Sequence, residues 1–97
     1  MKILVFSGTS DSKAAKITKD MLAECKKRGM NHIEAVTANM FTTDLKQLEE
    51  SHNPDIILRL STKTLDTARP VIDGMPLVYA FMGPAKVYDE IQKYYHE

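Results

Sequence analysis

The opening of the chain constrains its fold most, because an unbroken apolar run leads directly into a polar loop and then into a helical pattern. Residues 3–6 are Ile-Leu-Val-Phe without polar alternation, which is typical of a strand buried on both faces of a sheet. Residues 7–12 form a loop rich in hydroxyl groups. Apolar residues then recur at three- and four-residue spacing, as on the inward stripe of a helix, at Ala14, Ile17, Met21, Leu22 and Cys25. This succession predicts a strand, a tight turn and a helix that packs on the sheet.

The alternation of strands and helices continues along the chain. We expect strands over residues 1–6, 33–38, 55–60 and 77–81, and helices over residues 12–28, 43–51 and 85–95. Residues 61–76 are predicted to be a loop, with one helical turn possible at residues 64–68, because prolines and a glycine interrupt any regular pattern there. Tyr79 and Phe81 alternate with Ala80, so we expect side chains of this strand in the core. The order of elements predicts the α/β class, with a parallel sheet and helices on both faces.

Length and composition exclude several classes of protein. The 97 residues suit a single domain over residues 1–97, and 13 basic side chains balance 13 acidic ones, so nothing indicates nucleic acid or an acidic membrane surface as a partner. His32, His52 and His96 lack metal-ligand spacing, and we expect neither a metal nor an organic cofactor. Cys25 is the one cysteine, so no internal disulfide forms and a cytoplasmic location fits. No run approaches the ~20 apolar residues of a membrane span, and the N-terminus lacks a signal-peptide pattern.

A candidate anion site follows the first expected strand. Ligands of open parallel sheets bind outside the carboxyl ends of the strands, and the unpaired N–H groups and dipole of a helix N-terminus favour negative charge. The segments expected at that edge are residues 7–12, 38–40, 61–64 and 82–83. The candidate phosphate-binding residues beside Ser7 are Gly8, Thr9, Ser10, Asp11, Ser12 and Lys13, and those of a second wall are Ser61, Thr62 and Gly83.

Each of these residues also has an ordinary structural interpretation. The loop residues can cap the helix, and a cap competes with an anion for the same N–H donors. The charge of Asp11 opposes a bound phosphate unless its carboxylate points away. Lys13, in the first helical turn, is either a phosphate contact or a solvated side chain. Ser61 and Thr62 are either a second wall or a plain polar loop, and Gly83 either allows close backbone approach or makes a simple turn.

The chain resembles the IIB subunits of the sugar phosphotransferase system, and the closest branch is the galactitol-type IIB. The resemblance rests on the small-residue loop after the first strand, on residues 70–78 (Pro-Val-Ile-Asp-Gly-Met-Pro-Leu-Val) and on the closing helix. It covers essentially the whole chain. It implies a IIB- and phosphatase-like three-layer fold, with a four-stranded parallel sheet in the order 2-1-3-4 between helices.

The resemblance also implies a function. Such a subunit is a cytoplasmic phosphocarrier that takes a phosphoryl group from a histidine of a IIA partner, holds it on a cysteine and passes it to a sugar carried by a membrane IIC subunit. The acceptor position is residue 7, which is serine here. A hydroxyl gains less than a thiol from a helix N-terminus and needs an adjacent base, and none is evident. The serine is either native or a replacement for the cysteine, and the sequence is compatible with both.

Two other functions stay open. A non-catalytic phosphate-binding or regulatory module that lost its nucleophile would keep the loop without the transfer. A small phosphatase or arsenate-reductase-like enzyme would share the strand, loop and helix, and Lys13 follows Ser7 at the spacing of the cysteine and arginine in tyrosine-phosphatase loops. That class needs cysteine at position 7 and arginine at position 13, which this chain lacks. Met40, Met75 and Met82 are candidates for a partner-docking surface near the same edge.

Overall fold

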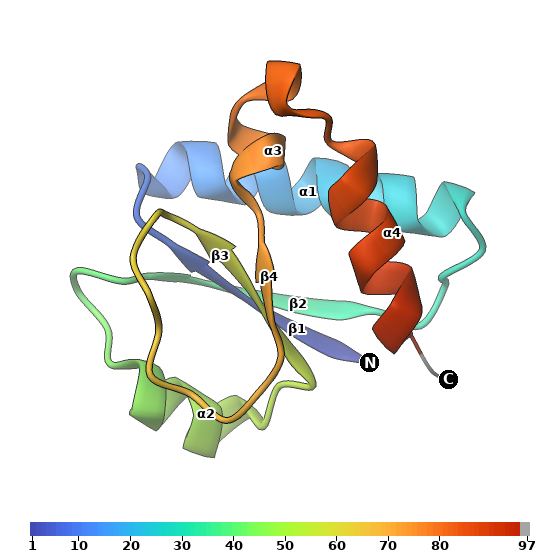
Figure 1. Cartoon of the computed structure of the whole chain (residues 1–97). Coiled ribbons are helices and arrows are strands. Elements are labelled where there is room, and N and C mark those ends of the chain that lie inside the picture. Colours follow the sequence, from blue (N-terminus) through green and yellow to red (C-terminus); the bar gives the residue numbers. More distant parts are fainter. Residues whose placement is uncertain (96–97) are drawn as a thin grey trace.

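Four parallel strands lie side by side in the order β2-β1-β3-β4, which confirms the predicted sheet (Figure 1). The structure is a computed structural model and describes residues 1–95. The strands are β1 (Lys2–Ser7), β2 (Glu34–Asn39), β3 (Ile56–Leu60) and β4 (Val71–Asp73). The central strand β1 pairs with β2 on one side and β3 on the other, and its last residue, Ser7, lies opposite Asn39 and Leu60. The carboxyl ends of the three longer strands therefore meet at one edge.

Helices cover both faces of the sheet, giving the three layers that the sequence predicts. Helix α1 (Asp11–Lys27) and helix α4 (Ala85–Tyr94) lie with the short α3 (Met75–Val78) on one face, and α2 (Leu45–His52) lies on the other (Figure 1). Within β1, Ile3 and Val5 pack under α1 and α4, whereas Leu4 and Phe6 join the core on the α2 side. All four side chains are buried. The strand is apolar without alternation because both of its faces are covered.

The predicted fourth strand at residues 77–81 is wrong, and its place in the sheet is taken by β4. The chain forms helix α3 and then the 3-10 helix η1 (Ala80–Met82) where that strand was expected. Pro76 fits the first turn of a helix, where its missing N–H costs nothing, and the carboxylate of Asp73 accepts a hydrogen bond from the amide of Met75 at 3.0 Å. Tyr79 and Phe81 are consequently exposed and contribute nothing to the core, contrary to expectation.

The loop over residues 61–70 crosses the α2 face of the sheet, and the helical turn that was possible at residues 64–68 does not form. Leu65 packs against the core on that face. The guanidinium of Arg69 links the end of the loop to α2 and to the segment before β3. It donates to the carboxylate of Glu49 at 3.0 Å and to the carbonyl oxygen of Pro54 at 3.4 Å. The loop therefore completes the cover that the eight-residue helix α2 provides only in part.

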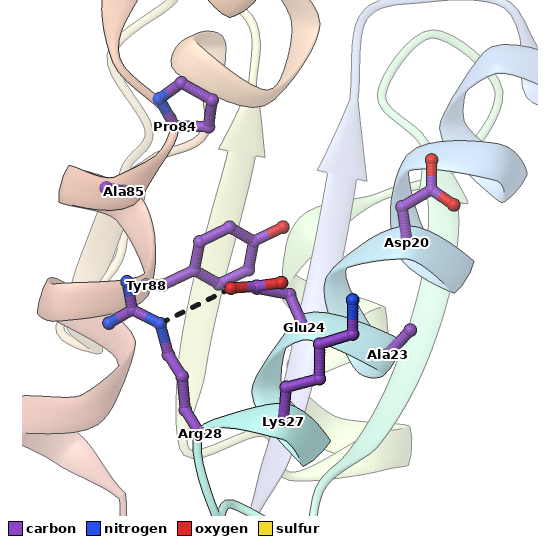
Figure 2. A pocket seen from close by; sticks show the side chains of 8 residues that line it. All are labelled: Asp20, Ala23, Glu24, Lys27, Arg28, Pro84, Ala85 and Tyr88. Atoms are coloured by element: carbon purple, nitrogen blue, oxygen red, sulfur yellow. Dashed lines mark ion pairs between the residues drawn. The ribbon is translucent and has the colours of Figure 1, made fainter.

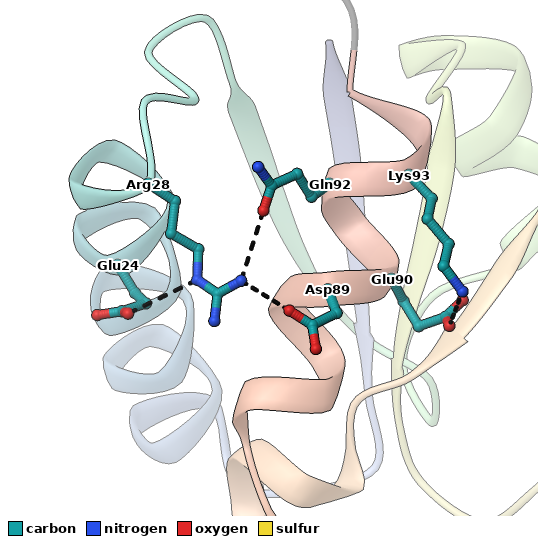
Figure 3. Close-up of polar contacts among 6 residues, drawn as sticks. All are labelled: Glu24, Arg28, Asp89, Glu90, Gln92 and Lys93. Atoms are coloured by element: carbon teal, nitrogen blue, oxygen red, sulfur yellow. Dashed lines mark hydrogen bonds and ion pairs between the residues drawn. The ribbon is translucent and has the colours of Figure 1, made fainter.

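Arg28 joins the C-terminal end of α1 to α4 (Figure 3). Its guanidinium lies 2.9 Å from Asp89 Oδ1, 3.5 Å from Gln92 Oε1 and 3.8 Å from Glu24 Oε1. The hydrogen bond to Asp89 raises the pKa of Arg28 above its ordinary value.

Within residues 1–95 no helix combines the length and the apolar character that crossing a bilayer requires.

Candidate anion site at the carboxyl edge of the sheet

The loop between β1 and α1 is tied to both neighbouring strands. The amide of Gly8 donates to the carbonyl oxygen of Leu60 at 3.0 Å, and the amide of Met40 donates to the carbonyl oxygen of Ser7 at 2.8 Å. A side chain at position 8 would be crowded, because a Cβ there would lie 2.9 Å from Met40 Sδ and 3.1 Å from Ser61 Cβ. The missing side chain of Gly8 thus allows the ends of β1, β2 and β3 to pack closely at the start of the loop.

Three backbone amides at the start of α1 are free to bind a ligand. Ser10, one of the loop residues expected to cap the helix, is the N-cap, and its hydroxyl accepts from the amide of Lys13 at 3.3 Å. The amides of Gly8, Thr9 and Lys13 are all bonded within the protein. In the part of the chain that the structure describes, the amides of Ser10, Asp11 and Ser12 have no protein acceptor. These three donors, at the positive end of a 17-residue helix, form the candidate anion site.

Ser7 is buried, and its hydroxyl makes two hydrogen bonds within the loop. The residue is 1% exposed, its Oγ accepts from the amide of Thr9 at 3.0 Å, and the hydroxyls of the two residues lie 2.9 Å apart. Thr9 Oγ1 donates to the carbonyl oxygen of Ser10 at 3.3 Å, which leaves Ser7 as the donor between the two hydroxyls. Over residues 1–95, Thr9 supplies every side-chain hydrogen bond of Ser7, so no carboxylate or imidazole takes its proton.

The carboxylate of Asp11 is turned toward the end of β2. Asn39 Nδ2 donates to Asp11 Oδ1 at 3.1 Å, and the amide of Phe41 donates to Asn39 Oδ1 at 2.8 Å, which fixes the orientation of the Asn39 side chain. Sequence reasoning placed residues 38–40 at this edge but did not single out Asn39. An amide side chain that directly ends a buried strand was the signal that could have found it.

Lys13 points toward the α3–η1 segment. Its Nζ lies 5.7 Å from the centroid of the Tyr79 ring, the distance of a cation–π contact, and its side chain is exposed. The arrangement places a positive charge at the rim of the anion site, beside an aromatic surface that the sequence interpretation had assigned to a buried strand.

The three residues predicted for a second wall have different surroundings. Ser61 lies against Gly8, and its Oγ is a buried atom without a hydrogen-bond partner among the described residues. Thr62 is exposed. Gly83 follows η1 at a φ of 85°, so it does not lie at the carboxyl end of a strand as predicted. Ser61 is therefore the one predicted wall residue with an unsatisfied polar atom beside the loop.

A separate hollow of about 490 Å³ lies between α1 and α4 and includes no residue of the loop (Figure 2). Glu24 and Arg28 in its wall pair with each other, and Arg28 also pairs with Asp89 outside it.

Among residues 1–95 there is no group of three His, Cys, Asp or Glu side chains that could hold a metal ion, and His96 lies outside the described residues. Cys25 is buried, and burial raises its pKa to about 11, so its thiol stays protonated and unreactive.

Comparison of the chain with protein-family models, with curated proteins and with solved structures finds no match.

Proposed function

We propose that this chain is a IIB-type phosphocarrier domain of a sugar phosphotransferase system. Its loop over residues 7–13 would receive a phosphoryl group from a histidine of a IIA donor in the cytoplasm and deliver it to a sugar carried by a membrane IIC subunit. The observation that carries the proposal is the set of three free amides, at Ser10, Asp11 and Ser12, beside the position at which the family holds its acceptor. The resemblance over the whole chain supports the same function.

The free amides would act by binding the oxygens of the phosphoryl group. During transfer, negative charge spreads over these oxygens, and preorganised N–H donors at a helix N-terminus stabilise it without rearrangement. The N–P bond of the phosphohistidine breaks as a bond forms between phosphorus and the side-chain atom of residue 7. The proton of residue 7 must leave in the same step, and with no base beside Ser7 the departing imidazole is the group that can take it.

The environment of Ser7 slows this step in the chain as it stands. The hydroxyl is buried and bonded twice to Thr9, so attack requires that both bonds be given up. These contacts also favour a second candidate function, a non-catalytic phosphate-binding or regulatory module that keeps the loop and has lost its nucleophile. The phosphatase alternative gains no support, because Lys13 stands over Tyr79 at the rim of the loop.

A phosphotransfer assay tests the proposal. The native chain, Ser7→Cys and Ser7→Ala are each incubated with a phosphorylated galactitol-type IIA subunit that is verified to label a IIB subunit of its own system. We expect stable label on residue 7 of Ser7→Cys, located by peptide mass spectrometry, little or none on the native chain and none on Ser7→Ala. Absence of label from Ser7→Cys would reject the phosphocarrier function, and phosphate binding without any label would support the module instead.

A further inference from the structure

Exposed apolar side chains concentrate in one short segment, residues 79–82, which we call the docking segment. Phe81 is 88% exposed, Tyr79 46% and Met82 41%. In Figure 1 this part of the chain, just after α3, forms the outermost point on the α1 side of the sheet. Aromatic and methionine side chains that cluster on a surface mark sites of protein–protein contact. The segment thus has the composition of a protein-contact surface.

The docking segment continues the surface of the anion site. The Nζ of Lys13 stands 5.7 Å from the ring centroid of Tyr79, and the rings of Tyr79 and Phe81 are 5.9 Å apart. Lys13 belongs to the first turn of α1, directly after the free amide of Ser12. Free N–H donors, a cation and two aromatic rings therefore follow one another along one rim of the loop.

We propose that the docking segment binds a protein partner that presents a phosphorylated side chain within an apolar surface. This inference rests on the proposed function, since such a partner would be the phosphodonor. A free phosphate ion would reach only the amides, whereas a protein carrying both groups contacts the amides and the aromatic rings together. Exposed Lys13 on α1 adds positive charge beside the segment, and Asn39 holds the carboxylate of Asp11 away toward β2. The charge of this rim is complementary to a phosphoryl group.

A protein fits this surface better than a lipid bilayer does. The apolar projection is only four residues long, so insertion would bury little area, and the net charge of zero provides no general attraction to anionic lipids. The free amides beside it are directional donors that need an acceptor at a fixed place, which a protein partner supplies.

The test compares two synthetic peptides of equal charge, each with a non-hydrolysable phosphohistidine analogue. One peptide has leucine on both sides of the analogue and the other has serine. We expect the native chain to bind the leucine peptide about tenfold more tightly, because Phe81 gains apolar contact with it. Phe81→Ser should abolish that preference. Tyr94→Ser, which removes an exposed aromatic ring from the far end of α4, should retain it.

Inorganic phosphate and vesicles provide the remaining arms of the experiment. Phosphate should shift the amide resonances of Ser10, Asp11 and Ser12 equally in the native chain and in both variants. Equal affinity for the two peptides, no effect of Phe81→Ser, or binding of the segment to phosphatidylcholine vesicles in place of either peptide would overturn the docking inference alone. A preference for leucine without any phosphate-induced shift would support the docking segment and reject the phosphate loop.

Discussion

The amide of Thr9 donates to the Oγ of Ser7 at 3.0 Å, and the hydroxyls of these two residues lie 2.9 Å apart. The side-chain atom of residue 7 therefore lies beside two groups of Thr9 that can donate to it. One is the backbone amide, and the other is the hydroxyl, which can rotate toward residue 7. Around a neutral hydroxyl, these contacts hold the side chain in place. Around a thiolate, both would stabilise negative charge.

The first prediction concerns the thiol of Ser7→Cys. The amide of Thr9, the hydroxyl of Thr9 and the N-terminus of α1 should together lower its pKa below the ordinary 8.5 or so of a free cysteine. Adding Thr9→Val to this variant removes the hydroxyl but keeps the amide, and should reduce the rate of alkylation by iodoacetamide at neutral pH by about tenfold, since one bond to a charged group is lost.

The control for this experiment is Thr9→Ser in the same background, which keeps a hydroxyl at the same place and should preserve the rate. The pH dependence of alkylation separates a change in pKa from a change in access to the thiol. An alkylation profile that is identical with threonine, serine and valine at position 9 would show that Thr9 does not act on residue 7.

The second prediction concerns Asp11, whose carboxylate lies at the end of α1 that carries the free amides. Asp11→Asn keeps an acceptor for Asn39 and removes the charge that repels an anion, so the affinity for phosphate should rise about fivefold. The same change should lower the free energy of unfolding by about 0.3 to 1 kcal/mol, because an acidic residue stabilises the N-terminus of a helix.

These opposite effects on affinity and stability distinguish Asp11 from an ordinary surface charge. Asp20→Asn on the same helix is the matched control and should leave phosphate affinity unchanged. Calorimetric titration with phosphate and urea unfolding measure the two effects. Weaker phosphate binding by Asp11→Asn would mean that Asp11 helps to build the site instead of opposing the ligand.

The third prediction compares two glycines that lie close to other atoms. A Cβ at Gly74 would lie 2.6 Å from Leu60 Cδ2 and 2.9 Å from the carbonyl oxygen of Arg59, which belongs to the backbone of β3 and cannot easily move. The first atom that a Cβ at Gly8 would meet is Met40 Sδ, part of a flexible side chain. Gly74→Ala should therefore cost about 1 to 3 kcal/mol of stability and Gly8→Ala less. Equal losses in urea unfolding would contradict this account.

Much of the fold could be predicted because β1 and α1 carry long, uninterrupted patterns. The sheet order was also predicted, although its fourth strand was not. Strand β4 has only three residues, too few for any periodicity, and it lies between Pro70 and Gly74. The apolar run after Pro76 looked like a strand, and nothing local to it shows that its side chains face outward. Exposure of that segment depends on α3 and η1 turning the chain over α1, which is a tertiary effect.

The site was predictable in outline but not in its hydrogen bonds. A strand that leads into a hydroxyl-rich loop and a helix predicts a candidate anion site from local sequence alone. Which amides are free depends on contacts from elsewhere, such as the bond from Gly8 to Leu60, a residue 52 positions away. The pairing of Asn39 with Asp11 likewise joins the end of β2 to the start of α1, and the spacing of the two residues in the sequence does not indicate it.

The fourth prediction concerns alkaline pH. Burial raises the pKa of Cys25 from 9.0 to about 11, so the folded chain holds this proton more tightly than the unfolded chain. The corresponding stability is complete below pH 9 and is lost as the pH rises toward 11, a loss on the order of 2 kcal/mol. Cys25→Ala should flatten the decline over this range, and burial of Tyr88, which raises its pKa to about 12, should sustain the decline at still higher pH. Denaturant unfolding at pH 8 and pH 11 measures the contribution of Cys25, and an unchanged decline in the variant would exclude Cys25 as its cause.

The most direct test of the account is titration of the native chain with inorganic phosphate, followed by nitrogen–proton correlation NMR. The free donors at the start of α1 should bind the ion, so the amides of Ser10, Asp11 and Ser12 should show the largest shifts, and these should saturate together at millimolar phosphate. Equal concentrations of chloride, at matched ionic strength, should not reproduce them. Shifts that are absent, that never saturate or that centre on another part of the surface would contradict the central claim that this loop is an oxyanion site.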